Sequence, residues 1–261
     1  MPQTPVNRPQ PDPKVPAVEP VGAVISIRDL KAACATCSLR ELCMPFGFTA
    51  EQLAHIDSLV GSRKRLRKGE TLFDSGDGFS DLYAVWMGSL KTTVLAEDGR
   101  EQVTGYQLPG DIIGLDGIGD DRHTGRAVAL QDSEVCVLPF HRLEVLARKV
   151  PALQHNLQRF LAREITRDQT VMLLLGSMRA EERVAAFLLD VAERYRRRGY
   201  SGTNYVLRMT REEIGSFLGL KLETVSRLFS RFQQEGIVRI QGREVTILDG
   251  VALRQLCGTR A

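Results

Sequence analysis

The sequence predicts an α+β protein in which an N-terminal double-stranded β-roll, a kind of jelly roll, precedes a long dimerisation helix and a C-terminal winged helix-turn-helix. Three observations predict this order. Short strand-like runs and regular glycine turns fill residues 65–140, and a helical repeat of apolar residues follows to about residue 178. The remaining chain contains a capped helix, a glycine turn, a second helix and a hairpin pattern.

The N-terminal part divides into a tail and a cysteine-bearing segment. Seven of the eleven prolines fall within residues 1–20, which we expect to form a disordered tail. Residues 21–47 contain three cysteines, and a cap-like Thr-x-x-Gln pattern predicts a short helix from Thr49 to Leu59. No apolar run reaches the roughly eighteen residues needed to cross a membrane, and the first residues lack the apolar core of a signal peptide. We therefore expect a cytoplasmic protein.

Residues 48–141 are predicted to form the β-roll. The strand-like runs are LYAVW, KTTVLA, EQVTGYQL and SEVCVLP, and turns such as Gly76-Asp77-Gly78 and Pro109-Gly110-Asp111 separate them. Many short strands with turn signals at regular spacing are typical of a sandwich or roll.

Residues 142–178 are predicted to form one long dimerisation helix. Its seam consists of residues that step by four, three, four and three: Leu161, Ile165, Asp168, Met172 and Leu175. A helix with such a seam usually pairs with a copy of itself, so we expect a homodimer. Asp168 would then face its own copy, and two partly buried carboxylates repel each other. The dimer should be only marginally stable, unless Asp168 instead forms a surface pair with Arg163 or Arg167.

Residues 179–261 are predicted to form the winged helix-turn-helix, after a helix over Ala180–Arg198. Thr210-Arg-Glu-Glu213 is a capping box that starts the first helix of the motif, and Gly219 ends this helix. The second helix of the motif runs from about Leu222 to Glu235. The run IVRI-QGRE-VTIL predicts a hairpin wing. This layout is typical of a DNA-binding element.

The second helix carries polar side chains on one face, near its N-terminus. Arg227 can donate two hydrogen bonds to a guanine, and Glu223 can accept one from a cytosine amino group. Ser226 is small enough to approach a thymine methyl or a base edge. The alternative is an ordinary solvated face, but the capping box, glycine turn and wing favour DNA binding. The net charge of +3 agrees with phosphate contacts without requiring them.

Three of the five cysteines lie within ten residues, in the pattern Cys34-x2-Cys37-x5-Cys43, and Cys136 can supply a fourth ligand. Four thiolates fit zinc or an iron–sulfur cluster, and a three-plus-one arrangement is less typical of structural zinc. The alternatives are reduced thiols without a metal and, for Cys136 alone, a buried core residue. We interpret Cys257 as a free thiol.

The stretch TREEIGSFLGLKLETVSRLFSRFQQEGIV closely resembles the recognition region of the CRP/FNR family, and the resemblance covers most of residues 30–256. The resemblance implies a cyclic-nucleotide-binding-like roll, and its FNR branch implies an oxygen-labile [4Fe–4S] cluster and an inverted TTGAT-N4-ATCAA repeat. Ser38 and Leu42 match family positions that govern the exposure of the cluster to oxygen. RNA polymerase is the implied partner, with contact loops around Asp74–Asp81 and Glu97–Arg100.

Cyclic-nucleotide sensing is not expected. Family members that bind a cyclic nucleotide use a glutamate and an Arg-Ser or Arg-Thr pair, but Leu115 and His123-Thr124 stand at these positions. An apolar leucine cannot accept a ribose hydroxyl, and a largely neutral histidine holds phosphate poorly.

The resemblance implies that the cluster orders the cysteine segment and stabilises the dimer, so that oxygen would loosen the dimer and release DNA. The same cysteines could instead report nitric oxide or redox state, and a zinc-stabilised regulator or a purely structural metal protein are further alternatives. An enzyme is not expected. The four histidines are scattered, no triad spacing occurs, and GDIIGLDGIG lies among strands rather than at a strand-to-helix junction.

Overall fold

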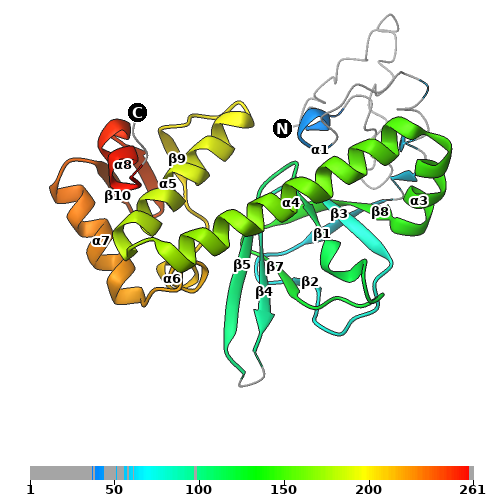
Figure 1. Ribbon diagram of the computed structural model, residues 1–261, viewed down its shortest axis with the longest axis horizontal. Coiled ribbons are helices and arrows are strands. Elements are labelled where there is room, and N and C mark those ends of the chain that lie inside the picture. The colour runs from blue at the N-terminus through cyan, green and yellow to red at the C-terminus, as the bar shows by residue number, and fades with distance from the viewer. Residues whose placement is uncertain are drawn as a thin grey trace, which may run out of the picture. The chain divides into compact units, whose positions relative to one another are not determined.

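The computed structural model describes residues 37, 39–43, 51, 56–57, 59–60, 62–96 and 99–258 (Figure 1). Within them the chain is α+β, as predicted, with a strand-rich part followed by helices and a small C-terminal sheet. The predicted tail over residues 1–20 lies outside the described residues. So does most of the predicted helix from Thr49 to Leu59, of which Glu51, Ile56, Asp57 and Leu59 are described and are helical.

Two four-stranded antiparallel sheets form the β-roll. One sheet has the order β1 (Ser62–Leu66), β8 (Ser133–Pro139), β3 (Asp81–Met87) and β6 (Ile112–Ile113). The other has the order β2 (Thr71–Phe73), β7 (Arg126–Ala129), β4 (Leu90–Leu95) and β5 (Glu101–Gln107). All four runs that the sequence predicted as strands are therefore strands, namely β3, β4, β5 and β8.

Alternation along the strands separates two apolar clusters. Val85 and Val135 are fully buried in the cluster that also contains Leu90 and Ala127 from the other sheet. Ala84 and Cys136, one residue along, belong to a second cluster with α3 (Phe140–Lys149). Cys136 therefore points away from the interior of the roll and toward the helices that cover it.

The predicted single helix over residues 142–178 is wrong in one respect, because the chain forms two helices. Helix α3 ends at Lys149, and α4 runs over Pro151–Ser177. Val150 between them is extended, with φ −123° and ψ 93°, and Pro151 is the first residue of α4. Proline lacks a backbone N–H and disfavours helical geometry in the preceding residue, so the helix restarts there. The seam residues all lie on α4.

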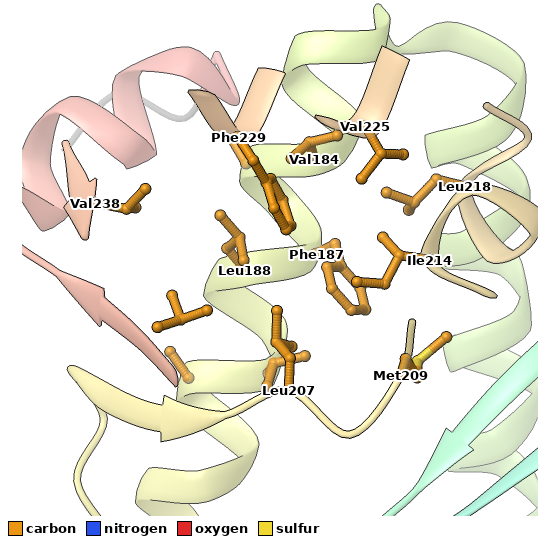
Figure 2. Close-up of a cluster of buried hydrophobic side chains, with 14 of the residues drawn as sticks. Val184, Phe187, Leu188, Leu207, Met209, Ile214, Leu218, Val225, Phe229 and Val238 are labelled. Atoms are coloured by element: carbon orange, nitrogen blue, oxygen red, sulfur yellow. The ribbon is translucent and has the colours of Figure 1, made fainter. Parts of the chain in front are cut away.

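The C-terminal part contains α5 (Ala180–Arg197), α6 (Arg211–Leu218), α7 (Leu222–Gln234) and α8 (Gly250–Leu256). A small sheet has the order β10 (Val238–Gln241), β11 (Glu244–Ile247) and β9 (Asn204–Val206). Figure 2 shows Phe187 and Leu188 of α5 meeting Ile214 of α6 and Phe229 of α7 in the shared core. The predicted hairpin wing is confirmed as β10 and β11, which pair from Val238–Ile247 to Gln241–Glu244.

No helix in the described ranges is long and apolar enough to cross a membrane.

Candidate nucleic-acid interface and cysteine site

The first helix of the helix-turn-helix begins with the predicted capping box. Thr210 Oγ1 accepts a hydrogen bond from the Glu213 backbone N–H at 3.1 Å, and Glu213 Oε2 accepts one from the Thr210 N–H at 2.7 Å. Glu213 also pairs with Lys91 of β4 at 3.0 Å. Burial raises the pKa of Glu213, but these hydrogen bonds and Lys91 outweigh it and hold that pKa below its ordinary value. The start of α6 is thus fixed by two independent sets of contacts.

The turn between α6 and α7 depends on Gly219, whose φ of 63° lies in the left-handed region. Glycine adopts this conformation without steric cost, so it ends α6 and lets Leu220 return to the core. Gly215, one turn earlier, has no room for a side chain, since a Cβ there would lie 2.6 Å from the Leu220 carbonyl oxygen. The two helices therefore approach closely, with α7 starting at Leu222.

Helix α7 buries one face and exposes the other. Val225, Leu228, Phe229 and Phe232 are buried, whereas Glu223 and Arg227 are exposed and Ser226 is half-buried. Among the described residues, no hydrogen bond or ion pair engages the Glu223 or Arg227 side chain. The three predicted DNA-reading side chains therefore lie near the start of one helix, two of them with polar groups available to a partner.

Arg231, one turn further along α7, already forms ion pairs within the protein. Its guanidinium pairs with Glu181 of α5 through two contacts of 2.9 Å and with Glu235 at 2.7 Å. These carboxylates raise the pKa of Arg231 above its ordinary value. The structure thus separates Arg231, which anchors α7 on α5, from Arg227, which is available for binding.

Three of the four predicted cluster ligands are described, while Cys34 and the neighbouring Ser38 lie outside the described residues. Cys43, the last residue of α1 (Arg40–Cys43), and Cys136 of β8 pack against the same apolar cluster. Cys37 lies close enough to Cys136 for its charge to raise the pKa of Cys136. Cysteines almost a hundred residues apart in sequence are therefore brought to one side of the roll.

No group of three or more cysteine, histidine or acidic side chains reaches metal-binding geometry within the described residues, which omit Cys34. Leu42, also predicted to border the cluster, packs on the turn after β5. A Cβ at Gly110 would lie 2.6 Å from Cβ of Leu42. The cysteine-bearing helix therefore contacts the Pro109–Asp111 turn.

Leu115, His123 and Thr124, which stand where the resemblance would place the nucleotide contacts, all contact other residues of the roll. His123 is buried, and its ring stacks on Phe73 with centroids 3.7 Å apart. Asp116 Oδ2 accepts hydrogen bonds from the backbone N–H groups of Thr124 and Gly125 at 2.9 and 3.1 Å. Leu115 packs against the apolar cluster near Cys136. An internal carboxylate thus satisfies the backbone donors of this turn.

The predicted seam is largely exposed on α4. Ile165 is 58% exposed and Met172 is 69% exposed, with Asp168 between them also exposed. Leu161 is half-buried, and Leu175 packs partly against the core of the C-terminal part. Arg167, one candidate partner of Asp168, instead pairs with Glu164 at 3.5 Å and reaches the carbonyl oxygen of Tyr106 at 3.3 Å.

Sequence reasoning missed the ionic contacts between the roll and α5. Asp111 accepts hydrogen bonds from Arg194 and Arg198, and Arg198 also donates to the Pro109 carbonyl oxygen at 2.6 Å. A second contact joins β5 to α6, where the Val103 N–H donates to Ser216 Oγ at 2.9 Å. The only available signal was the run of arginines at the end of α5, which does not identify a partner.

A β-roll followed by a helix-turn-helix with an exposed polar reading face defines a DNA-binding transcription regulator. Comparison with known proteins gives its family. Residues 63–149 match the cyclic nucleotide-binding domain model, and residues 182–256 match the Crp-like helix-turn-helix domain model.

The chain is 47% identical over 227 residues to the transcriptional regulatory protein btr of Bordetella pertussis, covering 87% of this chain and 94% of that protein. It is 42% identical over 225 residues to the fumarate and nitrate reduction regulatory protein of Escherichia coli, covering 86% and 90%. The solved structure of FixK2 from Bradyrhizobium japonicum is 32% identical, with a TM-score of 0.71, covering 77% and 98%. The chain belongs to the CRP/FNR family of transcription regulators, is of the FNR type, and is not an enzyme.

Proposed function

We propose that this regulator binds a [4Fe–4S] cluster through Cys34, Cys37, Cys43 and Cys136 and responds to oxygen. In the cluster-bound state it forms a homodimer that reads an inverted TTGAT-N4-ATCAA-like repeat and activates or represses genes of anaerobic metabolism. The observation that carries the proposal is the gathering of Cys37, Cys43 and Cys136 on one side of the roll.

The residues present fit such a group better than they fit a cyclic nucleotide. Thiolates are the preferred ligands of iron–sulfur clusters, and the described cysteines are half-buried rather than sealed in the core. The nucleotide position, by contrast, holds a stacked histidine and an internal carboxylate. When bound, the cluster would supply sensitivity to oxygen.

The chain's own residues supply the rest of the mechanism. Cys34, Cys37 and Cys43 would tie the cysteine segment to β8 through Cys136. The cysteine segment would then be held against the β-roll, which precedes α4 in the chain. The exposed seam of Ile165, Asp168 and Met172 would pair with its copy. Asp168 opposes that pairing, because two facing carboxylates repel and resist desolvation. The dimer would therefore depend on the ordered cysteine segment.

Contact with DNA is assigned to α7. Arg227, Glu223 and Ser226 would enter the major groove, and a dimer would place two such helices on the two halves of the repeat. RNA polymerase is the proposed second partner. Its proposed contact surface consists of the turns around Asp74–Asp81 and Glu97–Arg100, of which Glu97 and Asp98 lie outside the described residues.

The test is anaerobic purification of the full chain with an absorption spectrum and iron and sulfide assays, before and after exposure to air. We expect about four irons per chain. We also expect specific binding to the repeat and loss of both the iron and the binding in air. Cys136→Ser should hold no cluster, whereas Cys257→Ser is the matched control and should behave as the parent. One zinc ion and no visible absorption would replace the proposal with a zinc-stabilised regulator. A cluster that is stable in air but lost on exposure to nitric oxide would indicate that the regulator responds to nitric oxide rather than to oxygen.

A further inference from the structure

The side chain directly opposite Cys136 across the sheet is an arginine. In the antiparallel pairing of β1 with β8, Arg63 faces Cys136, and on the other side of β8 Cys136 faces Ala84. Directly opposed residues point to the same face of a sheet, so the Arg63 side chain leaves the sheet on the side where the cysteines gather. β1 is an edge strand of its sheet.

Two neighbours fix the position of the Arg63 guanidinium. Its Cζ lies 3.8 Å from the centre of the Trp86 ring, and its Nη1 lies 3.7 Å from Oε1 of Glu134. The side chain is only 21% exposed. A long edge-strand arginine would normally extend into water, so the stack on Trp86 and the pair with Glu134 hold this one against the sheet.

The donors of Arg63 are only partly used. The guanidinium lies beside Cys136, close enough for its charge to favour the thiolate form. Its Nε is buried and, among the described residues, has no hydrogen-bond acceptor. Leaving a buried donor unpaired destabilises the folded protein, so such an atom calls for an explanation. A guanidinium held beside a cysteine, with a buried N–H still available, is suited to a ligand that presents sulfur acceptors.

We propose that Arg63 is a positioning residue for the iron–sulfur cluster, holding the Cys136 ligand and donating N–H···S hydrogen bonds to the sulfur atoms around it. This inference rests on the proposed function. Four thiolates give the site negative charge, and hydrogen bonds to sulfur, net charge and solvent exposure set the properties of such clusters.

Arg65 provides a matched control on the same strand. Its Nε also contacts Glu134, at 3.4 Å, but its side chain is 63% exposed and it pairs across the sheet with Glu134 rather than with Cys136. Arg65→Met therefore removes an equal charge from β1 and the same ion-pair partner from Glu134, while leaving the neighbour of Cys136 intact.

The experiment compares the full-length parent, Arg63→Met, Arg63→Lys and Arg65→Met, purified anaerobically. The readouts are the rate at which a chelator removes iron without oxygen and the Fe–S stretching bands in resonance Raman spectra. Loss of a neighbour that orients a metal ligand commonly weakens metal binding about 10- to 100-fold. We therefore expect roughly tenfold faster iron release and shifted bands in Arg63→Met. Arg63→Lys should fall between, because it keeps the charge but loses the planar donors. Arg65→Met should match the parent.

Equal release rates and unchanged bands in Arg63→Met, with iron bound, would overturn the role of Arg63 and leave the cluster proposal intact. A parent and an Arg65→Met variant that bind no iron would overturn both. If Arg63→Met does not fold, as judged by circular dichroism, the comparison of Arg63→Lys with the parent decides, since lysine preserves the charge over Trp86.

Discussion

Arg198, the residue directly after α5, donates a hydrogen bond from Nη2 to Oδ1 of Asp111, at 2.6 Å, in the turn that follows β5. The side chain of Arg198 is 5% exposed. Arg194 holds the other carboxylate oxygen, and Leu42 packs on the neighbouring Gly110. One short turn of the roll thus contacts the cysteine-bearing helix on one side and the first helix of the C-terminal part on the other.

Asp111→Asn should lower the free energy of unfolding by about 2–4 kcal/mol at neutral pH, because it leaves two largely buried guanidinium groups without their anion. The asparagine keeps the shape of the side chain, so packing is little changed. Urea unfolding of the full chain measures the effect. Glu193→Gln is the control, since Glu193 pairs with Arg196 and Arg197 on the exposed side of α5 and exposed pairs contribute little. Equal midpoints for Asp111→Asn and the parent would contradict the assigned role.

The contribution of Asp111 should disappear in acid. Burial raises the pKa of this carboxyl, but the charges of Arg194, Arg198 and Arg167 outweigh burial and place its pKa below the ordinary value of 3.8. Because the pKa of Asp111 is lower in the folded chain than in the unfolded chain, the carboxylate stabilises the fold when the pH is above its ordinary pKa. This stabilisation is lost as the pH falls through the pKa of the folded chain. The stability gap between parent and Asp111→Asn should therefore be constant near neutral pH and narrow below about pH 4. Other carboxylates titrate in both proteins, so a gap that stays constant into strong acid would contradict the shift.

Short sequence motifs predicted the strands and helix ends that depend on neighbouring residues alone. Short strand-like runs between regular glycine turns predicted β3, β4, β5 and β8, and Thr210 and Glu213 predicted the start of α6. The sequence also contains a signal for the break before α4, because Pro151 disfavours helical geometry at Val150. The prediction of one helix over residues 142–178 did not use this signal.

The contacts that pass between parts of the chain had no local signal. Asp111 and Arg194 are 83 residues apart, so their pairing depends on how the roll meets α5. Arg63 faces Cys136 only because of the register between β1 and β8. The Asp116 carboxylate, likewise, satisfies the N–H groups of Thr124 and Gly125 only after the chain between them has folded into a turn. Sequence reasoning named the cysteines, their neighbours Ser38 and Leu42, and the reading helix, but not the contacts that connect them to the rest of the chain.

Cyclic AMP at millimolar concentration should leave the melting temperature unchanged. A ligand at about 100 times its Kd would add roughly 2.7 kcal/mol of stability, which a thermal shift assay detects readily. Asp116 already occupies the Thr124 and Gly125 amides, and His123 stacks on Phe73. Asp116→Ala frees the amides but leaves Leu115 and His123 in place, so it should not create binding either. A rise in melting temperature with cyclic AMP in the parent chain would show that the roll keeps a nucleotide site.

Asp168→Ala should produce a dimer that persists in air and keeps binding DNA there. The substitution removes two facing carboxylates from the proposed seam, while the exposed Ile165 and Met172 still provide apolar contact. Sedimentation of the air-exposed protein measures the oligomeric state. Thr170→Ala is the control, because Thr170 is exposed on α4 outside the seam and its hydroxyl donates to the Thr166 carbonyl oxygen of the same helix. A monomeric Asp168→Ala variant in air would remove the argument for charge repulsion.

Arg227→Ala should weaken binding to the inverted repeat by about 1–3 kcal/mol and relax the preference for the base pair that Arg227 reads. Arg231→Ala removes an equal charge one turn away, but Arg231 is held by Glu181 and Glu235 and should not contact a base. Titrations on the repeat and on sites with single base-pair changes separate the two effects. If Arg227 instead met only phosphate, its loss would weaken all sites alike and reduce the salt dependence of binding. Loss of discrimination at one position, absent from Arg231→Ala, is therefore the result that assigns base reading to α7.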